Sequence, residues 1–334
     1  MDSLAQVFDG FSSKKIFVIG DVMIDSYMWG KTNRISPEAP VPVVSVTDKE
    51  NRLGGAANVG LNIKAMGAES VLCAIIGDDA QGQVFRELLE KRSMTDKGLM
   101  ETNDRPTTVK TRVIASSQHL LRVDEEKSEA VSKTIARKFA ERTAELMIKE
   151  KPDALVFEDY DKGNITPEVI QIIVEKARKM NIPVLVDPKK RNFFAYKNVT
   201  LFKPNFKELV EGMKITLEKT DTEAVANAAS KLKQKLNAEY VMVTLSEAGV
   251  LLTNGESQYT MPAQKREIAD VSGAGDTVIS VLACCMAGKL NAQKSTVIAN
   301  IAGGQVCEKV GVVPVDKAQL LAESELYFEK NAIF

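Results

Sequence analysis

Residues 270–276 read Asp270-Val-Ser-Gly-Ala-Gly-Asp276, and they lead directly into an apolar stretch from Thr277 to Ala287 that is expected to be a helix. Gly273 and Gly275 have no Cβ, so the chain can turn tightly there and come close to a ligand. The unpaired N–H groups of a first helical turn favour an anion. The carboxylate of Asp276 could accept a proton from an alcohol while those N–H groups hold charge that develops on a phosphate. The alternative is that Asp276 only caps a buried helix.

A second glycine motif, Gly54-Gly55-Ala56-Ala57-Asn58, opens a predicted helix that runs to Met66. Two glycines let the backbone pass close to a polar ligand, and the Asn58 amide can both donate and accept hydrogen bonds. An ordinary glycine-rich start of a helix is the alternative. The motif is not a dinucleotide fingerprint, since no Gly-x-Gly-x-x-Gly follows the first predicted strand, and the Walker pattern is absent from the sequence as well.

The composition excludes several classes of protein. The balance of 44 basic and 45 acidic residues among 334 argues against general affinity for nucleic acid or an anionic membrane surface. Four cysteines lie within apolar stretches, which is typical of buried thiols in the reducing cytoplasm. The single histidine, His119, argues against a histidine-rich metal site and a Ser-His-Asp triad. No apolar run is long enough to span a membrane.

Strands and helices alternate along the chain, which predicts an α/β fold with a mostly parallel sheet covered on both faces. Nothing resembling a linker divides the sequence, so residues 1–334 are interpreted as one domain. Extended or hairpin segments at about 27–48 and 107–124 do not follow the alternation, and we assign them to a small β-sheet lid. Two helices, Thr277–Ala287 and Ala292–Val310, are expected to close the chain.

Polar residues follow the predicted strands. Asp21, Asp159, Asp187 and Asn205 come at or just after strand ends. In parallel sheets ligands bind beyond the carboxyl ends of the strands, so a site is expected at this edge.

The two glycine motifs, in this order and at this distance, resemble the ribokinase-like carbohydrate kinases of the PfkB family. The resemblance implies a three-layer α/β/α sandwich with a β-sheet lid, and transfer of the γ-phosphoryl group of ATP to a sugar hydroxyl. In that family's pattern, Asp276 matches the catalytic base, and Gly273, Ala274 and Gly275 match the loop that stabilises the phosphoryl group. Gly54, Gly55, Asn58 and Asp25 match positions that bind the sugar.

Two further segments resemble the parts of the family's site that bind the nucleotide. Asn205 and Glu208 resemble the family's Asn-x-x-Glu element, in which Glu208 would hold Mg²⁺ largely through water. Locally, a capping box at a helix start explains the same two residues. Thr244, Ser246 and Gly249 match the nucleotide-binding segment, although the family more often has glycine at position 246. Met23 stands where many sugar kinases have asparagine.

Longer strings are similar to the heptose 7-phosphate kinases, among them Gly20-Asp-Val-Met-Ile-Asp25 and Glu158-Asp159-Tyr160-Asp161-Lys162-Gly163. The implied reaction is phosphorylation of D-glycero-D-manno-heptose 7-phosphate at its anomeric hydroxyl to the 1,7-bisphosphate, in the ADP-heptose pathway to the lipopolysaccharide core. Many relatives carry an added nucleotidyltransferase domain, which is expected to be missing from this chain.

A substrate that already carries phosphate needs fixed cations. The candidates are Lys110, Arg112, Arg122, Lys162, Lys189 and Arg191, with Lys162 and Lys189 favoured because they follow strand ends; for each, a solvated surface charge is the alternative. Asp21 and Asp159 are further candidate sugar ligands. The expected partners are a small-molecule sugar phosphate and a second copy of the chain, docked through apolar lid residues such as Val41, Val43 and Val44.

Three other functions compete with this interpretation. The chain could phosphorylate a different sugar or sugar phosphate, or it could bind a sugar without catalysis. A dinucleotide-dependent oxidoreductase is disfavoured because the fingerprint is missing. The sequence leaves open the anomer formed and a requirement for a monovalent cation.

Overall fold

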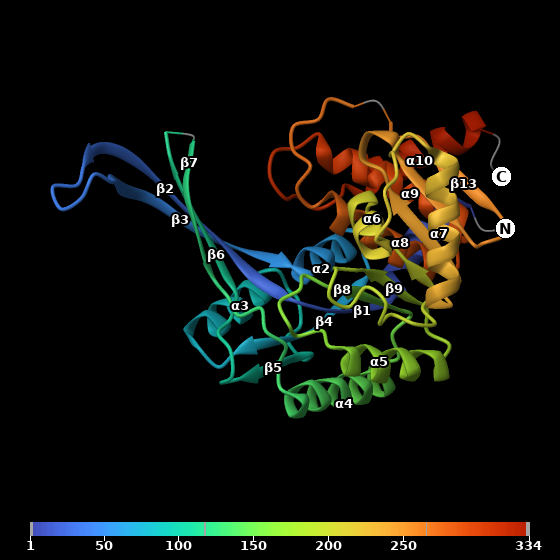
Figure 1. Ribbon diagram of the computed structural model, residues 1–334, viewed down its shortest axis with the longest axis horizontal. Helices are drawn as coiled ribbons and strands as arrows, with labels where there is room; N and C mark the ends of the chain where they lie inside the picture. Colours follow the sequence, from blue (N-terminus) through green and yellow to red (C-terminus); the bar gives the residue numbers. More distant parts are fainter. Residues whose placement is uncertain (1–2, 117, 265, 332–334) are drawn as a thin grey trace.

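The computed structural model describes residues 3–116, 118–264 and 266–331, and within them the largest feature is a nine-stranded sheet (Figure 1). Its strand order is β13-β12-β11-β10-β9-β8-β1-β4-β5. Pairing is parallel from β11 to β5 and antiparallel for β12 and β13. The strands are β1 (Lys15–Gly20), β4 (Glu69–Gly77), β5 (Leu99–Thr102), β8 (Ala154–Glu158), β9 (Val184–Asp187), β10 (Leu201–Phe202), β11 (Tyr240–Thr244), β12 (Val250–Thr253) and β13 (Gln258–Met261).

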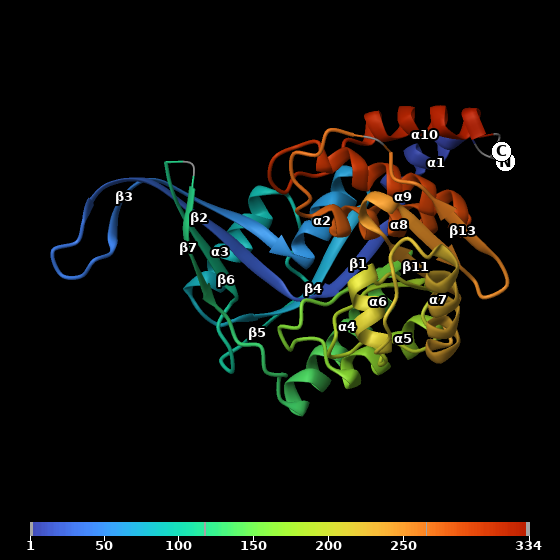
Figure 2. The same cartoon turned by 45° about the horizontal axis from the view of Figure 1, so that its top comes forward.

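Helices cover both faces of this sheet, which confirms the three-layer α/β/α sandwich (Figure 2). Because parallel strands are buried on both faces, they read as continuous apolar runs, as β1 does. One hydrophobic core lies beneath α1 (Leu4–Gly10), α2 (Ala56–Ala65), α3 (Ala80–Lys91), α8 (Ala274–Ala287), α9 (Ala292–Cys307) and α10 (Lys317–Asn331). The other lies beneath α4 (Lys133–Glu150), α5 (Pro167–Lys179), α6 (Phe206–Met213) and α7 (Thr222–Leu236).

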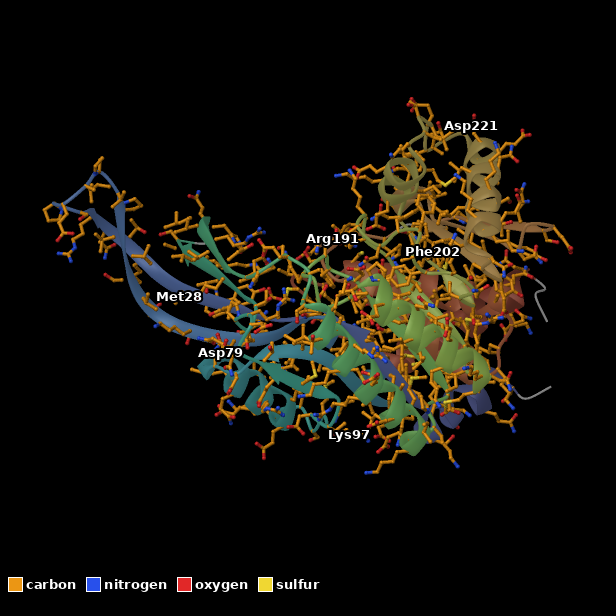
Figure 3. All side chains as sticks on the ribbon, turned by 60° about the horizontal axis from the view of Figure 1, so that its bottom comes forward. Met28, Asp79, Lys97, Arg191, Phe202 and Asp221 are labelled. Carbon is orange, nitrogen blue, oxygen red and sulfur yellow. The ribbon has the colours of Figure 1, made fainter. Side chains whose placement is uncertain are left out.

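Four strands of the described chain form a second sheet that projects from the body, with the order β3-β2-β6-β7 (Figure 3). They are β2 (Val22–Ile35), β3 (Pro42–Gly55), β6 (Val109–Ala115) and β7 (Gln118–Glu125). The sheet begins two residues after β1 ends, and β3 runs directly into α2. The arm is therefore attached at the carboxyl edge of the large sheet, where a ligand site is expected. We call this second sheet the lid sheet.

Side chains alternate along a strand, so the lid sheet has two faces with different residues. One face is charged and the other is less polar. Asp25 pairs in register with Arg52 on β3 and with Lys110 on β6, which places the three on one face. On the other face Leu121 and Val123 of β7 are exposed, with Leu121 59% accessible. Val41 is also exposed, whereas Val43 and Val44 are partly buried.

Helices α1 and α10 and strand β5 were not expected from the sequence. The prediction that two helices close the chain is therefore wrong. The third closing helix, α10, buries only Leu320, Ser324 and Phe328, so its apolar stripe is narrow and one of its buried positions is polar. Helix α1 has a Ser3–Gln6 capping box, a signal that the sequence did contain. Strand β5 has only four residues at the sheet edge.

Helix α9 ends at Cys307, before the end at Val310 that was predicted from the sequence. The cysteines are free thiols, as expected, and Cys73, Cys284 and Cys285 are buried. Within the described part of the chain, no helix combines the length and the apolar character needed to cross a bilayer.

Candidate active site

The two glycine motifs lie side by side, as the sequence predicted, because α2 and α8 pack together at their N-terminal ends. The Asn58 side chain donates a hydrogen bond to the Asp276 carboxylate. Beside this contact, Thr277 Oγ1 donates to Asn62 Oδ1 (3.3 Å) and Ser280 Oγ donates to the Val59 carbonyl (3.1 Å). Polar contacts between the helices therefore fix the position of Asp276 relative to the Gly54–Asn58 segment.

Asp276 is in the first turn of α8 and is only 7% exposed. Burial raises the pKa of its carboxyl to about 6, with a further contribution from the nearby Asp187 carboxylate. Hydrogen bonds from Tyr160 Oη (2.9 Å) and Asn58, together with the Lys203 ammonium, oppose this rise. A carboxylate with a pKa near 6 is largely ionised at neutral pH, yet it is more basic than an exposed aspartate, which suits a general base.

The loop before Asp276 has the backbone that the sequence predicted. Gly273 precedes the helix with φ of +78°, in the left-handed region that favours glycine. Gly275 faces an ion pair between Lys203 Nζ and Asp187 Oδ2 (2.7 Å), both almost fully buried. A Cβ on Gly275 would lie 3.7 Å from Asp187 Oδ2 and 3.9 Å from Lys203 Nζ. The N-terminus of α8 thus meets a buried cation at the edge of the large sheet.

A cavity of about 620 Å³ opens beside Asn58 at the base of the lid sheet. Asp25 also lines it, and Asp25 Oδ1 accepts a hydrogen bond from Arg112 Nη1 (2.6 Å). A side chain at position 54 would collide with the Asp25 carboxylate, which explains the glycine there. Residues of β3 and α3, with Val312 and Pro314, complete the walls.

Two predicted sugar ligands are buried away from this cavity. Asp21 is fully buried, and its carboxylate accepts backbone N–H groups of Tyr160 (3.0 Å), Lys162 (3.1 Å) and Asn164 (3.3 Å). Burial raises its pKa to about 6. Asp159 accepts hydrogen bonds from Asn192 Nδ2 (3.1 Å) and Tyr196 Oη (2.8 Å), again below the surface. Both carboxylates hold the segment after β8 in place.

The residues predicted to bind the nucleotide come together at the carboxyl ends of β10 and β11. Asn205 pairs with Thr244 in an isolated bridge. Asn205 and Glu208 form a full capping box on α6, with 2.8 Å for each hydrogen bond. Ser246 has φ of +53° and Gly249 has φ of +89°. The backbone at Ser246 is left-handed, a conformation that glycine adopts more readily than serine.

The residues present fit a Mg²⁺ ion held through water and phosphate. Glu208 Oε2 accepts the Asn205 N–H, and Oε1 accepts Lys189 Nζ at 2.8 Å. Among residues 3–116, 118–264 and 266–331, no three carboxylate, histidine or cysteine side chains are arranged to enclose a metal. Mg²⁺ in kinases is usually bound by one or two carboxylates together with water and substrate phosphates, and this donor set is compatible with that.

Several site residues were missed or undervalued by the sequence interpretation. Tyr160 contacts Asp276, and Lys189 lies 5.7 Å from the centre of the Tyr160 ring. Lys203 supplies the buried charge beside Gly275. Burial and the neighbouring carboxylates of Asp187 and Asp276 raise the pKa of Glu158 well above its usual value. The signal for Tyr160, Lys203 and Glu158 was their place at a strand end within polar strings, whereas Lys189 had been predicted as a substrate ligand.

A buried carboxylate beside a glycine turn at a helix start, at the carboxyl edge of an α/β sheet that carries a second small sheet, is the arrangement expected of small-molecule phosphotransferases that act on alcohols. The profile of the pfkB family of carbohydrate kinases matches residues 13–318. The chain belongs to this family and is a sugar kinase. The family implies ATP as the phosphoryl donor and usually Mg²⁺.

The chain is also similar to curated proteins named HldE. The bifunctional protein HldE of Campylobacter jejuni strain RM1221 is 39% identical over 320 residues, covering 95% of this chain and 66% of the relative. The bifunctional protein HldE of Koribacter versatilis is 36% identical, covering 96% of this chain and 65% of the relative. The chain thus spans about two thirds of the length of these relatives.

Solved structures share the fold. Escherichia coli phosphofructokinase-2 in complex with potassium superposes with a TM-score of 0.74 at 20% identity, covering 93% of this chain and 99% of that one. Arabidopsis thaliana ribokinase complexed with ribose and ATP gives a TM-score of 0.70 at 18% identity, covering 92% and 98%. At these identities the likeness concerns the fold alone.

Proposed function

We propose that the protein phosphorylates D-glycero-D-manno-heptose 7-phosphate at the anomeric hydroxyl, with ATP as donor, to give the 1,7-bisphosphate. The observation that carries the proposal is the contact of Asp276 with Asn58 at the end of a cavity that Asp25 also lines. The choice of sugar is supported by the similarity to HldE proteins, which covers 95% of this chain, and by the sequence segments that resemble heptose 7-phosphate kinases.

In the proposed reaction Asp276 accepts the proton of the anomeric hydroxyl as its oxygen attacks the γ-phosphorus in line with the leaving ADP. The N–H groups at the start of α8, from Gly273 to Gly275, stabilise charge on the transferring phosphoryl oxygens. Mg²⁺, when bound near Glu208, supplies further neutralisation of phosphate charge. Asn58 and Asp25 orient the sugar.

Other residues position this machinery rather than touch the substrate. Tyr160 holds one oxygen of Asp276, and Lys203 with Asp187 sets the electrostatic field behind the glycine turn. Asp21 and Asp159 act through the backbone that they anchor. Lys189 joins Glu208 to Tyr160, and Asn205 with Thr244, Ser246 and Gly249 shapes the nucleotide side.

The lid sheet is proposed to close over the sugar and exclude water, which suppresses ATP hydrolysis. Its less polar face, with exposed Ile35, Val41, Leu121 and Val123, is proposed to bind the lid of a second copy. Exposed apolar clusters of this kind commonly mark an interface. A cytoplasmic enzyme acting as a homodimer on a small sugar phosphate is consistent with these features.

A monovalent cation is a further part of the proposal, and the glycine turn and the loop after α9, which Asp270 joins, are the segments that it would order. The Asp270 carboxylate accepts the N–H groups of Ser272 (2.9 Å) and Gly311 (3.0 Å). Ordering of these loops by K⁺ predicts faster turnover in potassium chloride than in tetramethylammonium chloride at equal ionic strength. Equal rates would remove the cation from the proposal and leave the kinase function intact.

Release of ADP from ATP in the presence of a panel of sugars tests the main proposal. Heptose 7-phosphate should give the highest kcat/KM, ahead of fructose 6-phosphate and ribose. A preference for another sugar would favour the alternative of a different sugar kinase. Sugar binding by calorimetry without ADP release would favour a silent sugar-binding protein.

A further inference from the structure

The six basic residues predicted to hold the substrate phosphate all have carboxylate partners in the structure. Two of them, Lys110 of the lid sheet and Lys162 of the body, share one partner, Glu126. The remaining pairs are Lys110 and Arg122 with Asp124, Arg112 with Asp25, Lys189 with Glu208, and Arg191 with Asp161. Glu126 differs from these other partners because it joins a cation of the lid sheet to a cation of the body.

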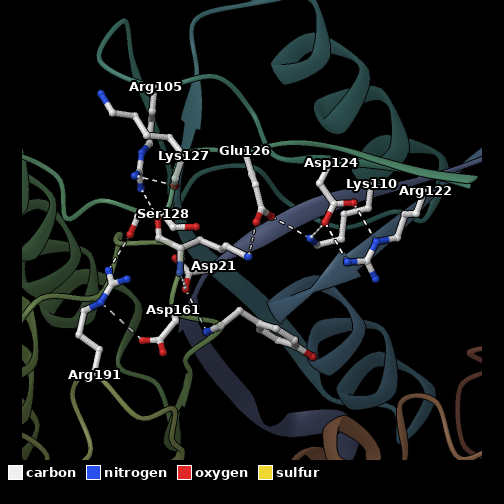
Figure 4. Close-up of polar contacts among 12 residues, drawn as sticks. Asp21, Arg105, Lys110, Arg122, Asp124, Glu126, Lys127, Ser128, Asp161 and Arg191 are labelled. Atoms are coloured by element: carbon white, nitrogen blue, oxygen red, sulfur yellow. Dashed lines mark hydrogen bonds and ion pairs between the residues drawn. The ribbon is translucent and has the colours of Figure 1, made fainter.

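The chain that leads from the lid sheet back to the body is fastened to the loop after β8. We call residues 126–129 the return segment. The guanidinium of Arg105, only 7% exposed, donates to two carbonyls of this segment (3.0 and 2.7 Å) and to the Lys162 carbonyl (2.7 Å). Arg191 Nη1 donates to the Ser128 carbonyl (2.6 Å). The two arginines therefore hold the return segment against the body (Figure 4).

Glu126 adds a charged bridge across the same junction. Its Oε2 accepts a hydrogen bond from Lys110 Nζ of β6 (2.8 Å), and its Oε1 accepts one from Lys162 Nζ (2.6 Å). The three side chains are between 13% and 20% accessible, so solvent screens these contacts less than it screens surface pairs. Burial tends to raise the pKa of Glu126, but hydrogen bonds from Lys110 and Lys162 lower it overall. Glu126 is therefore ionised at neutral pH and binds both ammonium groups.

On the lid sheet, the bridge reaches the strands that carry the predicted sugar ligand. Lys110 is opposite Asp25 of β2 in the strand register, which places the two side chains on the same face. Asp25 lines the cavity. Lys110 also pairs with Asp124 of β7 (2.9 Å), so its ammonium links neighbouring strands of the sheet. Glu126 thus connects the sheet that bears Asp25 to the body.

On the body, the bridge reaches the loop that holds Asp276. The backbone N–H groups of Lys162 (3.1 Å) and Tyr160 (3.0 Å) both donate to Asp21 Oδ2. Tyr160 Oη donates in turn to Asp276 Oδ1 (2.9 Å). Because Lys162 and Tyr160 share one anchor and are two residues apart, a displacement of Lys162 also moves the hydroxyl that positions Asp276.

We propose that Glu126 is a positioning residue that couples the placement of the lid sheet over the sugar to the placement of Asp276 by Tyr160. The inference rests on the proposed function, because it takes Asp276 as the base and the lid sheet as the cover of the sugar. With the bridge intact, the base is in place when the sugar is covered, which disfavours transfer of the phosphoryl group to water. Lys162 then has a role different from the predicted one, since its ammonium binds Glu126 rather than a phosphate.

Three variants test the bridge: Glu126→Gln, Lys162→Met and the two combined. A hydrogen bond to a charged group is worth about tenfold or more. Each single change should lower kcat about tenfold and leave KM for the sugar phosphate and for ATP within about threefold. The double variant should also lose only about tenfold, because residues that act as one unit are not additive. Glu125→Gln, the same change at the exposed neighbour, is the matched control and should keep kcat within about twofold.

The two roles of Lys162 predict opposite effects of the Glu126 variant on KM. If Lys162 binds the substrate phosphate, Lys162→Met raises KM for the sugar phosphate, whereas Glu126→Gln frees the ammonium and lowers this KM. That pair of results would overturn the proposal. Losses in kcat that multiply to about 100-fold in the double variant would overturn it as well.

Hydrogen exchange measures the coupling without relying on turnover. Trp29, the single tryptophan of the chain, lies on β2 and stacks on Tyr27 of the cavity wall (5.4 Å between ring centres), so its fluorescence reports sugar binding. Heptose 7-phosphate is the probe, and fructose 6-phosphate replaces it if the fluorescence does not respond. At saturation, exchange should slow in β6 and at residues 160–164 of the unchanged protein, but only in β6 of Glu126→Gln.

The exchange result separates the coupling from the identity of the substrate. If the unchanged protein shows this pattern but forms no heptose 1,7-bisphosphate, the proposed substrate fails and the coupling stands. If residues 160–164 are protected equally in both proteins, or are not protected in the unchanged protein, the coupling is refuted.

Discussion

Replacement of Asp276 by asparagine should abolish most of the catalytic activity and at the same time stabilise the folded chain. A positioned general base contributes about 10²- to 10⁴-fold to a proton transfer, which corresponds to about 3 to 5 kcal/mol of activation free energy. Asparagine has a similar shape but cannot accept the proton. Turnover should therefore fall by this factor, whereas KM for ATP should change little.

The expected gain in stability follows from the raised pKa. The pKa of Asp276 rises from 3.8 to about 6 on folding, a difference worth about 3 kcal/mol. The folded state holds its proton to higher pH than the unfolded state, so this cost is absent below about pH 3.8 and complete above about pH 6. Asparagine keeps only one acceptor for the donors Tyr160 and Asn58, and the lost hydrogen bond costs about 1 kcal/mol. The net gain should be about 2 kcal/mol at pH 8.

Urea denaturation at pH 8 and pH 5 measures the free energy of unfolding of both proteins, and ADP release measures turnover. The stability gain should be smaller at pH 5, where about half of the ionisation cost remains. Asp79→Asn is the control of opposite sign: burial tends to raise its pKa, but hydrogen bonds from Thr107 and Gly82 lower it overall, so this variant should be destabilised at pH 8. An Asp276→Asn variant that keeps its turnover, or that is less stable than the unchanged protein at pH 8, refutes the reasoning.

Three other predictions concern the pH profile, the metal and the lid. The value of kcat/KM should fall tenfold per pH unit below about pH 6, because Asp276 must be ionised to act as the base; a flat profile between pH 5 and 8 would contradict this role. Glu208→Gln should raise the Mg²⁺ concentration needed for half-maximal rate about tenfold and lower the melting temperature slightly, since glutamine still completes the capping box with Asn205 but loses the ion pair with Lys189; an unchanged Mg²⁺ titration would remove Glu208 from the metal site. Leu121→Asp should convert a dimer into a monomer in analytical ultracentrifugation, whereas Gln118→Asp on the same strand should not, and a Leu121→Asp dimer would exclude this face as the interface.

The body of the fold was predictable because local signals agreed with one another. Apolar runs such as Lys15–Gly20 gave the strands, and glycine and capping residues marked the helix ends. A second small sheet was predicted from segments that did not fit the alternation, but its first two strands begin earlier, at Val22, and end later, at Gly55, than the predicted segment 27–48. Helix α10 was missed because only three of its residues are buried, one of them Ser324.

The parts of the site that depend on local backbone conformation were predictable from the sequence. The turn at Gly273 and the contact between Asn58 and Asp276 followed from motifs, since glycine and helix-start requirements are local. Ion pairing was not predictable, because it joins segments distant in sequence, as with Arg112 and Asp25 or Lys162 and Glu126.

Phosphorus NMR of the products formed from ATP and heptose 7-phosphate most directly tests the claim that Asp276 and the glycine turn serve phosphoryl transfer to the sugar. The account predicts ADP and a new resonance of an anomeric phosphate beside the retained 7-phosphate, both lost in the Asp276→Asn variant. ADP with free inorganic phosphate and an unaltered sugar, or a new phosphate at any other carbon, would contradict it.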